Sequence, residues 1–241
     1  MAHPKTRRSR NTNQLRIIGG AWRSRKLSFP DIAGLRPTPD RVRETLFNWL
    51  APIIQGARCL DLFAGSGALG LEALSRGASE VVMIDRDPQV IAQLRAHIET
   101  LHAQGAYLVQ ADALQYLQNH PPLETNPPSL PHDASLPREE VQGAPPCAPV
   151  RQFLPHPPLK KGGRGGFDIV FLDPPFRHNL LVPCCQWLER YGWLRPGARI
   201  YLEAEDKAEL TDLPQNWRIT HSKQAGQVSY HLALRETDPA T

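Results

Sequence analysis

The chain has 241 residues, 41% of them hydrophobic, which is enough to bury a substantial core. It carries 28 basic and 24 acidic residues, for a net charge of +4. It contains no run of about eighteen apolar residues and no apolar stretch after its first basic residues, which argues against a membrane span or a secretory signal. These features predict a cytoplasmic globular protein that does not bind a membrane.

The basic charge is concentrated at the N-terminus. Eight of the 28 basic residues and none of the 24 acidic residues fall before Pro30, so the chain beyond Pro30 has a net charge of −4. A phosphate-rich polymer is the expected partner, bound with a salt-dependent affinity. Residues 1–13 are expected to form a basic disordered tail that either binds nucleic acid or only aids solubility, whereas Arg16–Lys26 favours nucleic acid.

The first ordered elements are expected to be a hairpin and a helix within residues 14–55. Leu15–Ile18 and Ala21–Leu27 have strand-forming composition on either side of a Gly19-Gly20 turn. In the helix that follows, Thr38 is the expected N-cap and Pro39 the first helical residue.

Strands and helices then alternate along the chain. Strands are predicted over 58–62, 80–85 and 106–110, with helices over 69–75 and from Asp87-Pro88 onward. A progression of this kind predicts a mainly parallel sheet.

A proline-rich stretch interrupts the progression. Residues 119–166 hold twelve of the 24 prolines and few large apolar side chains, so they are expected to form a disordered insert in a single domain that covers residues 14–241. Beyond the insert we predict a strand over 167–172, a helix over 180–191 and a strand over 199–203. A terminal antiparallel hairpin over 217–222 and 228–234 follows.

The tetrapeptide Asp173-Pro174-Pro175-Phe176 ends the apolar run Phe167–Leu172. The two prolines stiffen the loop and supply no N–H donor, so its carbonyl groups remain available to a substrate. An exocyclic base amine is a poor nucleophile, and Asp173 and the Pro174 carbonyl are candidate acceptors for its two N–H groups. Phe176 is a candidate for stacking on the base, a contact worth roughly 1–3 kcal/mol. The alternative is that the prolines only end the strand in a tight turn.

A glycine-rich turn covers Asp61–Gly70 between a predicted strand and a predicted helix, the context required of a nucleotide-binding G-x-G-x-x-G motif. Asp85 ends the next strand, where a carboxylate accepts from ribose hydroxyls. Asp61 would repel a pyrophosphate but suits a cationic amino-acid tail, and Asp112 can accept from an adenine amine. These acids favour S-adenosylmethionine over a dinucleotide, although Asp112 also fits as a helix N-cap.

The four cysteines, Cys59, Cys147, Cys184 and Cys185, lack the spacing of a metal site. We expect reduced structural thiols and no metal.

The chain resembles the bacterial 16S rRNA guanine-N2 methyltransferase family, of the type called small-ribosomal-subunit methyltransferase D. The resemblance rests on Arg16–Gly20, Arg36–Asn48, Asp61–Gly70, Asp173–Phe176 and the hairpin around Ala225-Gly226. The block Arg36–Asn48 is its most specific part. The insert departs from the compact length of the family.

The resemblance implies an α/β, Rossmann-like class I methyltransferase fold, with a mostly parallel seven-stranded sheet and a C-terminal antiparallel hairpin. It also implies S-adenosyl-L-methionine as methyl donor and 16S rRNA as substrate, in the assembled 30S subunit or a late precursor. The expected catalytic residues are Asp173, Pro174, Pro175 and Phe176. The expected cofactor contacts are Asp61, Phe63, Gly65, Gly67, Asp85, Arg86, Asp112 and Ala113. The expected RNA contacts are Arg16, Arg23, Arg25, Lys26, Arg36, Arg41 and Arg43.

Other functions remain open at this point. A DNA adenine-N6 methyltransferase would use the same Asp-Pro-Pro-aromatic loop, and an RNA-binding assembly factor could retain the fold without catalysis. A nicotinamide dehydrogenase would share the glycine turn and Asp85. The chain carries no coiled-coil or repeat signal, so we expect a monomer.

Overall fold

The computed structural model describes residues 13–29, 38–119, 166–175, 179–205, 210, 212–226 and 228–236. The predicted tail as far as Thr12, the side chains of Arg36 and Phe176, and the insert over 120–165 lie outside these residues. In the part of the chain that is described, no helix is long and apolar enough to cross a membrane.

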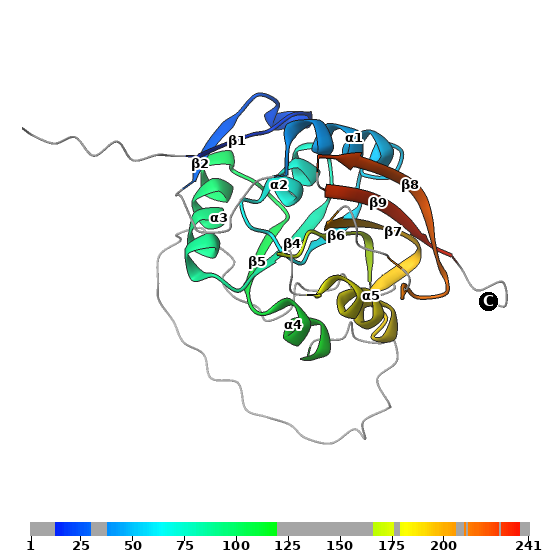
Figure 1. The fold of residues 1–241 in the computed structure, drawn as a ribbon. Helices are drawn as coiled ribbons and strands as arrows, with labels where there is room; N and C mark the ends of the chain where they lie inside the picture. Colours follow the sequence, from blue (N-terminus) through cyan, green and yellow to red (C-terminus); the bar gives the residue numbers. More distant parts are fainter. Residues whose placement is uncertain are drawn as a thin grey trace, which may run out of the picture.

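A seven-stranded sheet forms the centre of the molecule (Figure 1). Its strands are β3 (Arg58–Asp61), β4 (Glu80–Asp85), β5 (Ala106–Gln110), β6 (Phe167–Leu172), β7 (Leu194–Glu205), β8 (Trp217–Ala225) and β9 (Val228–Arg235). Their order is β5-β4-β3-β6-β7-β9-β8. All neighbours up to β7 pair in parallel, and β9 pairs antiparallel with both β7 and β8. The prediction of a mostly parallel sheet with a terminal antiparallel hairpin is confirmed.

Helices cover both faces of this sheet (Figure 1). The helices are α1 (Asp40–Leu50), α2 (Ala68–Ser75), α3 (Pro88–Leu101), α4 (Ala113–Asn119) and α5 (Leu181–Arg190). The first three pack on one face, and α4 and α5 pack on the other. The fold is therefore a three-layer α/β/α arrangement.

The sheet separates two hydrophobic cores, one on each face, because the side chains of each strand point alternately to the two faces. On β6, Ile169 and Phe171 belong to the core under α1 to α3, whereas Val170 and Leu172 belong to the core under α4 and α5. Successive side chains of a strand point to opposite faces, so strands covered on both faces read as unbroken apolar runs. The three cysteines of the described residues are free and buried in these cores: Cys59, Cys184 and Cys185.

The N-terminal hairpin forms a separate two-stranded sheet from β1 (Asn13–Arg16) and β2 (Lys26–Phe29). The prediction of a tight Gly19-Gly20 turn is wrong, because a longer loop with a 3₁₀ turn over Gly20–Trp22 joins the strands. The glycines instead lie against α2, where a Cβ added to Gly20 would fall 1.8 Å from the Ser75 carbonyl oxygen. Close packing on α2 therefore replaces the expected turn.

Helix α1 begins one residue later than expected. Pro39 occupies the N-cap position and Asp40 is the first helical residue, so Thr38 does not cap the helix. The Thr38 side chain points instead to the carboxyl edge of the sheet, where its hydroxyl donates to Asp173 Oδ2 over 3.4 Å.

Candidate active site

Acidic side chains gather where four neighbouring strands end. Asp61 and Asp85 are the last residues of β3 and β4, and Asp112 and Asp173 follow β5 and β6. Ligands of open α/β sheets bind outside these carboxyl ends. The structure thus brings the predicted acids of the cofactor site and of the Asp-Pro-Pro loop to one edge of the sheet.

The glycine turn carries the chain from β3 into α2. Gly67 has a φ of 79°, and a Cβ there would lie 2.6 Å from Leu94 Cδ2, so both the backbone and the packing require glycine. Gly70 approaches β4 so closely that a Cβ would lie 2.6 Å from Met83 Sδ. The turn therefore holds the first residues of α2 against the sheet.

The carboxylate of Asp61 is buried beneath this turn, with 1% of the residue exposed. Its Oδ2 accepts from the Gly70 N–H over 3.1 Å, whereas Oδ1 has no hydrogen-bond partner in the described part of the chain. Burial raises the pKa of Asp61 to about 7, against the opposing effects of the Gly70 and Phe63 amides. A buried acceptor without a donor fits a cationic ligand group.

Asp85 links the second strand to the glycine turn. Its Oδ2 accepts from the Gly65 N–H over 3.0 Å, and its Oδ1 accepts from the Asp87 N–H over 2.9 Å. Each carboxylate oxygen has a second acceptor site, so Asp85 remains able to bind hydroxyl groups.

Asp112 caps α4, since its Oδ1 accepts from the Gln115 N–H over 3.1 Å. The capping role considered from the sequence is therefore present, and it does not exclude a ligand at the second oxygen. The remaining predicted cofactor residues flank these acids: Phe63 is partly buried after β3, Arg86 is exposed after β4, and Ala113 is buried at the start of α4.

The described part of the Asp-Pro-Pro-Phe loop follows β6. Asp173 is partly exposed, Pro174 is buried and Pro175 is exposed. Burial of its carboxylate and the negative charges of Glu203 and Asp61 raise the pKa of Asp173 well above its usual range. A carboxyl group in this setting holds a proton more readily than a solvated aspartate.

The sequence did not single out Glu203. This residue lies near the end of β7 with 5% of its surface exposed, and its Oε2 accepts from the Tyr201 hydroxyl over 2.8 Å. The available signal was an acidic residue within the apolar strand Arg199–Glu203, a position that is rarely buried without a reason.

Five of the predicted RNA contacts have exposed side chains: Arg16, Arg23, Arg25, Lys26 and Arg41. Arg16 pairs with Asp40 over 2.7 Å. These cations lie on the N-terminal hairpin, its loop and the first turn of α1.

The prediction that Arg43 contacts RNA is wrong, because only 1% of the residue is exposed. Its guanidinium donates to the Thr38 carbonyl over 3.1 Å and pairs with Asp40 and Glu72. The helical position of Arg43 turns it toward α2, and this long side chain is stabilised there by two carboxylates.

Glu72 joins the N-terminal hairpin to α2, and sequence reasoning also missed it. It is completely buried, and its two oxygens accept from the backbone N–H groups of Ile18 and Gly19, each over 2.8 Å. Arg76 donates to the same carboxylate over 2.7 Å. The contact lies between residues far apart in the chain, so no local pattern predicts it.

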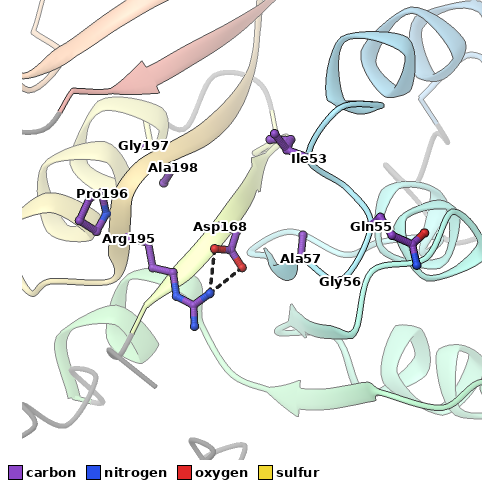
Figure 2. Close-up of a pocket in the computed structure, with 9 residues that line it drawn as sticks. All are labelled: Ile53, Gln55, Gly56, Ala57, Asp168, Arg195, Pro196, Gly197 and Ala198. Atoms are coloured by element: carbon purple, nitrogen blue, oxygen red, sulfur yellow. Dashed lines mark hydrogen bonds and ion pairs between the residues drawn. The ribbon is translucent and has the colours of Figure 1, made fainter. Parts of the chain in front are cut away.

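A hollow of about 280 Å³ lies at the opposite edge of the sheet, near the amino ends of β3, β6 and β7. Figure 2 shows Arg195 and Asp168 pointing toward one another in its wall, where Arg195 Nη1 lies 2.9 Å from Asp168 Oδ1. This ion pair satisfies both charges, and the hollow is separated from Asp61 and Asp173 by the length of the strands.

The strand order, the glycine turn after β3 and the acids at the carboxyl edge together define an α/β methyltransferase of class I, which uses S-adenosyl-L-methionine. The chain belongs to the family described as conserved hypothetical protein 95, which matches residues 15–126 and 153–234.

Comparison with known proteins agrees with this placement. The chain is 44% identical over 225 residues to ribosomal RNA small subunit methyltransferase D of Escherichia coli, covering 93% of this chain and 92% of that protein. A solved structure of the putative methyltransferase yhhF from Escherichia coli has a TM-score of 0.71 and 41% identity, covering 94% of this chain and 100% of that one. A Thermus thermophilus 16S rRNA N2 methyltransferase solved with AdoMet and guanosine shares the fold, with a TM-score of 0.56 at 18% identity, over 94% of this chain and 50% of its own.

Proposed function

We propose that the protein methylates the exocyclic N2 amine of a guanine in 16S rRNA, with S-adenosyl-L-methionine as the methyl donor. The observation that carries the proposal is the position of Asp173-Pro174-Pro175 at the end of β6, beside the strand that ends in Asp61. An acceptor for amine N–H groups thereby lies next to the candidate donor site.

On the donor side, the unpartnered Oδ1 of Asp61 suits the cationic amino-acid tail of the cofactor. Asp85 is the candidate for the ribose hydroxyls and Asp112 for the adenine amine. Gly65 and Gly67 allow close approach of the backbone, and Phe63, Arg86 and Ala113 border the same edge. When bound, the cofactor supplies an electrophilic methyl group.

On the acceptor side, Asp173 and the Pro174 carbonyl accept from the two N–H groups of the base amine. This orients the nitrogen and increases the electron density available to it. Pro175 stiffens the loop, and Phe176 is proposed to stack on the base.

The exposed cations of the hairpin and α1 supply the surface for RNA. These exposed cations are Arg16, Arg23, Arg25, Lys26 and Arg41, and Arg36 is proposed to extend the surface. The name of the Escherichia coli relative, ribosomal RNA small subunit methyltransferase D, supports 16S rRNA as the substrate. We propose the assembled 30S subunit or a late precursor as the form recognised, by a monomeric enzyme in the cytoplasm.

The test is methyl transfer from labelled S-adenosylmethionine to small-subunit particles from a strain that lacks the activity. Label in 16S rRNA, recovered as N2-methylguanosine after digestion to nucleosides, supports the proposal. Unlabelled rRNA would overturn it. Label recovered only in a parallel assay with DNA, as N6-methyl-2′-deoxyadenosine, would establish the alternative substrate. Cofactor binding by calorimetry separates an enzyme from a non-catalytic assembly factor of the same fold.

A further inference from the structure

We propose that Glu203 is a positioning residue for Asp173, and that the two carboxyl groups share one proton in the resting enzyme. The inference rests on the proposed function, because it concerns how Asp173 is presented to a substrate amine.

Strand register places the two groups side by side. Leu172 of β6 pairs with Leu202 of the parallel strand β7, so Asp173 and Glu203 occupy the next position on each strand. Two positions before Asp173 and Glu203, the side chains of Phe171 and Tyr201 lie in the core under α1 to α3. Because alternate side chains share a face, Asp173 and Glu203 point to the same side of the sheet.

The surroundings of the pair provide no compensating cation among the described residues. Glu203 is buried with 5% exposure, and its one hydrogen bond in the described chain is the contact from the Tyr201 hydroxyl. The donor to the Asp173 side chain in that part of the chain is Thr38. None of the ion pairs among the described residues involves either carboxylate.

Two ionised carboxylates that are close together and poorly solvated repel strongly, so one proton is retained between them. Burial raises the pKa of Glu203, and burial together with the charge of Glu203 raises the pKa of Asp173. The titratable groups facing the pair are Asp61 from β3, Tyr201 from β7 and Tyr230, which pairs with Glu203 from β9. None of these is a cation. Burial and the charge of Asp61 favour retention of the proton, and they outweigh the hydrogen bonds from the Tyr201 and Thr38 hydroxyls, which lower the pKa of Glu203 and of Asp173.

The shared proton gives Asp173 a defined orientation. The Tyr201 hydroxyl occupies Glu203 Oε2, which leaves Oε1 to carry the proton toward Asp173. Asp173 then remains an acceptor. One of its oxygens takes the shared proton, and each carboxylate oxygen has a second acceptor site, so a site remains for the amine beside the Thr38 hydroxyl. Without the proton, repulsion would turn Asp173 away, and with a second proton Asp173 would no longer be a pure acceptor.

The first experiment compares the pH dependence of kcat for the wild type, Glu203→Gln and Glu203→Ala, with Glu99→Gln on the exposed face of α3 as the matched control. A glutamine keeps an acceptor for Tyr201 and a donor for Asp173 but does not titrate. We expect the wild type and the control to lose activity on the alkaline side, where the shared proton is released. Glu203→Gln should retain most of the activity and lack this alkaline limb.

Glu203→Ala should lower kcat about 100-fold, the order of loss for a misplaced catalytic group, with little change in the KM for RNA. An unchanged alkaline limb in Glu203→Gln would overturn the proposal, as would full activity of Glu203→Ala.

The second experiment needs neither RNA nor turnover. Asp61, with a pKa of about 7, contributes a carboxylic-acid band of its own at neutral pH, so the readout is an infrared difference spectrum of the free protein in which that band cancels. The wild type minus Glu203→Gln, and the wild type minus Asp173→Asn, should each show the carbonyl stretch of one further protonated carboxylic acid at neutral pH. If this difference band is absent, the pairing is wrong even where guanine methylation is established. If the band is present but no guanine is methylated, only the proposed function fails.

Discussion

The backbone N–H of Gly19 donates to Glu72 Oε1 over 2.8 Å, so a completely buried carboxylate of α2 holds the loop of the N-terminal hairpin. The neighbouring Ser75 hydroxyl donates to the Gly19 carbonyl over 2.6 Å. The surface proposed to bind RNA is thereby attached to the helix that follows the glycine turn. The candidate cofactor site and the surface proposed to bind RNA therefore both depend on the position of α2.

Replacing Glu72 with Gln should destabilise the protein by about 3 kcal/mol, because Arg43 and Arg76 lose a buried partner. The measurement is the free energy of unfolding from urea titration. Glu99→Gln, which removes an exposed charge from α3, should change that free energy by no more than about 0.5 kcal/mol. Equal stability of the two variants would show that the buried carboxylate does not hold the hairpin.

Asp173→Ala should reduce kcat by at least about 100-fold, because the amine loses its charged acceptor. Cofactor affinity, measured by calorimetry, should change less than about threefold, because the cofactor contacts are assigned to other strands. Asp168→Ala is the control for an aspartate on the same strand, since Asp168 lies near the amino end of β6. Parallel losses of turnover and cofactor affinity in Asp173→Ala would contradict the assigned role.

The raised pKa of Asp61 predicts that both cofactor binding and protein stability depend on pH. A cationic ligand group prefers the ionised carboxylate, so affinity for S-adenosylmethionine should increase as the pH rises through about 7, the pKa of Asp61. Asp61→Asn should bind more weakly and lose this dependence. Calorimetry between pH 5.5 and 8.5, roughly one and a half units on either side of that pKa, is the measurement.

The stability of the free protein should change with pH in the opposite direction to the cofactor affinity. The folded-state pKa of Asp61 lies above its ordinary value of 3.8, so the folded protein binds more protons between these two pH values. The contribution of Asp61 to stability is therefore lost as the pH rises toward 7. Asp61→Asn should be more stable than the wild type at pH 8, by up to about 4 kcal/mol, and the difference should vanish near pH 4. A constant difference across this range would show that Asp61 titrates normally.

The exposed cations of the hairpin loop should act through phosphate contacts. The double variant Arg23→Ala and Arg25→Ala should weaken RNA binding and reduce the slope of log affinity against log salt by about 1–2. Arg190→Ala removes an exposed charge at the end of α5, on the opposite face of the sheet, and is the matched control. In Arg190→Ala, the slope of log affinity against log salt should equal that of the wild type. An unaltered slope in the double variant would show that the hairpin loop does not contact RNA.

Much of the fold was predictable because its signals are local. The glycine turn at Asp61–Gly70, the apolar run Phe167–Leu172 and the strands around Ala225-Gly226 each contain the residues that their backbone conformations require. The conformation at Gly19-Gly20 was not predictable in this way, because a contact with Ser75 decides it. Hairpin patterns describe only the residues within the hairpin.

By itself, the sequence determined the succession of elements, the parallel sheet, the glycine turn and the position of Asp173 at the end of a strand. These follow from side-chain periodicity and from the backbone preferences of glycine and proline. The tertiary structure alone decided that Arg43 is buried and that Thr38 faces Asp173. It also decided that Glu203 lies beside Asp173 on the neighbouring strand. Each of these depends on the register between segments distant in the chain, and that register is set only when the whole sheet and its helices pack together.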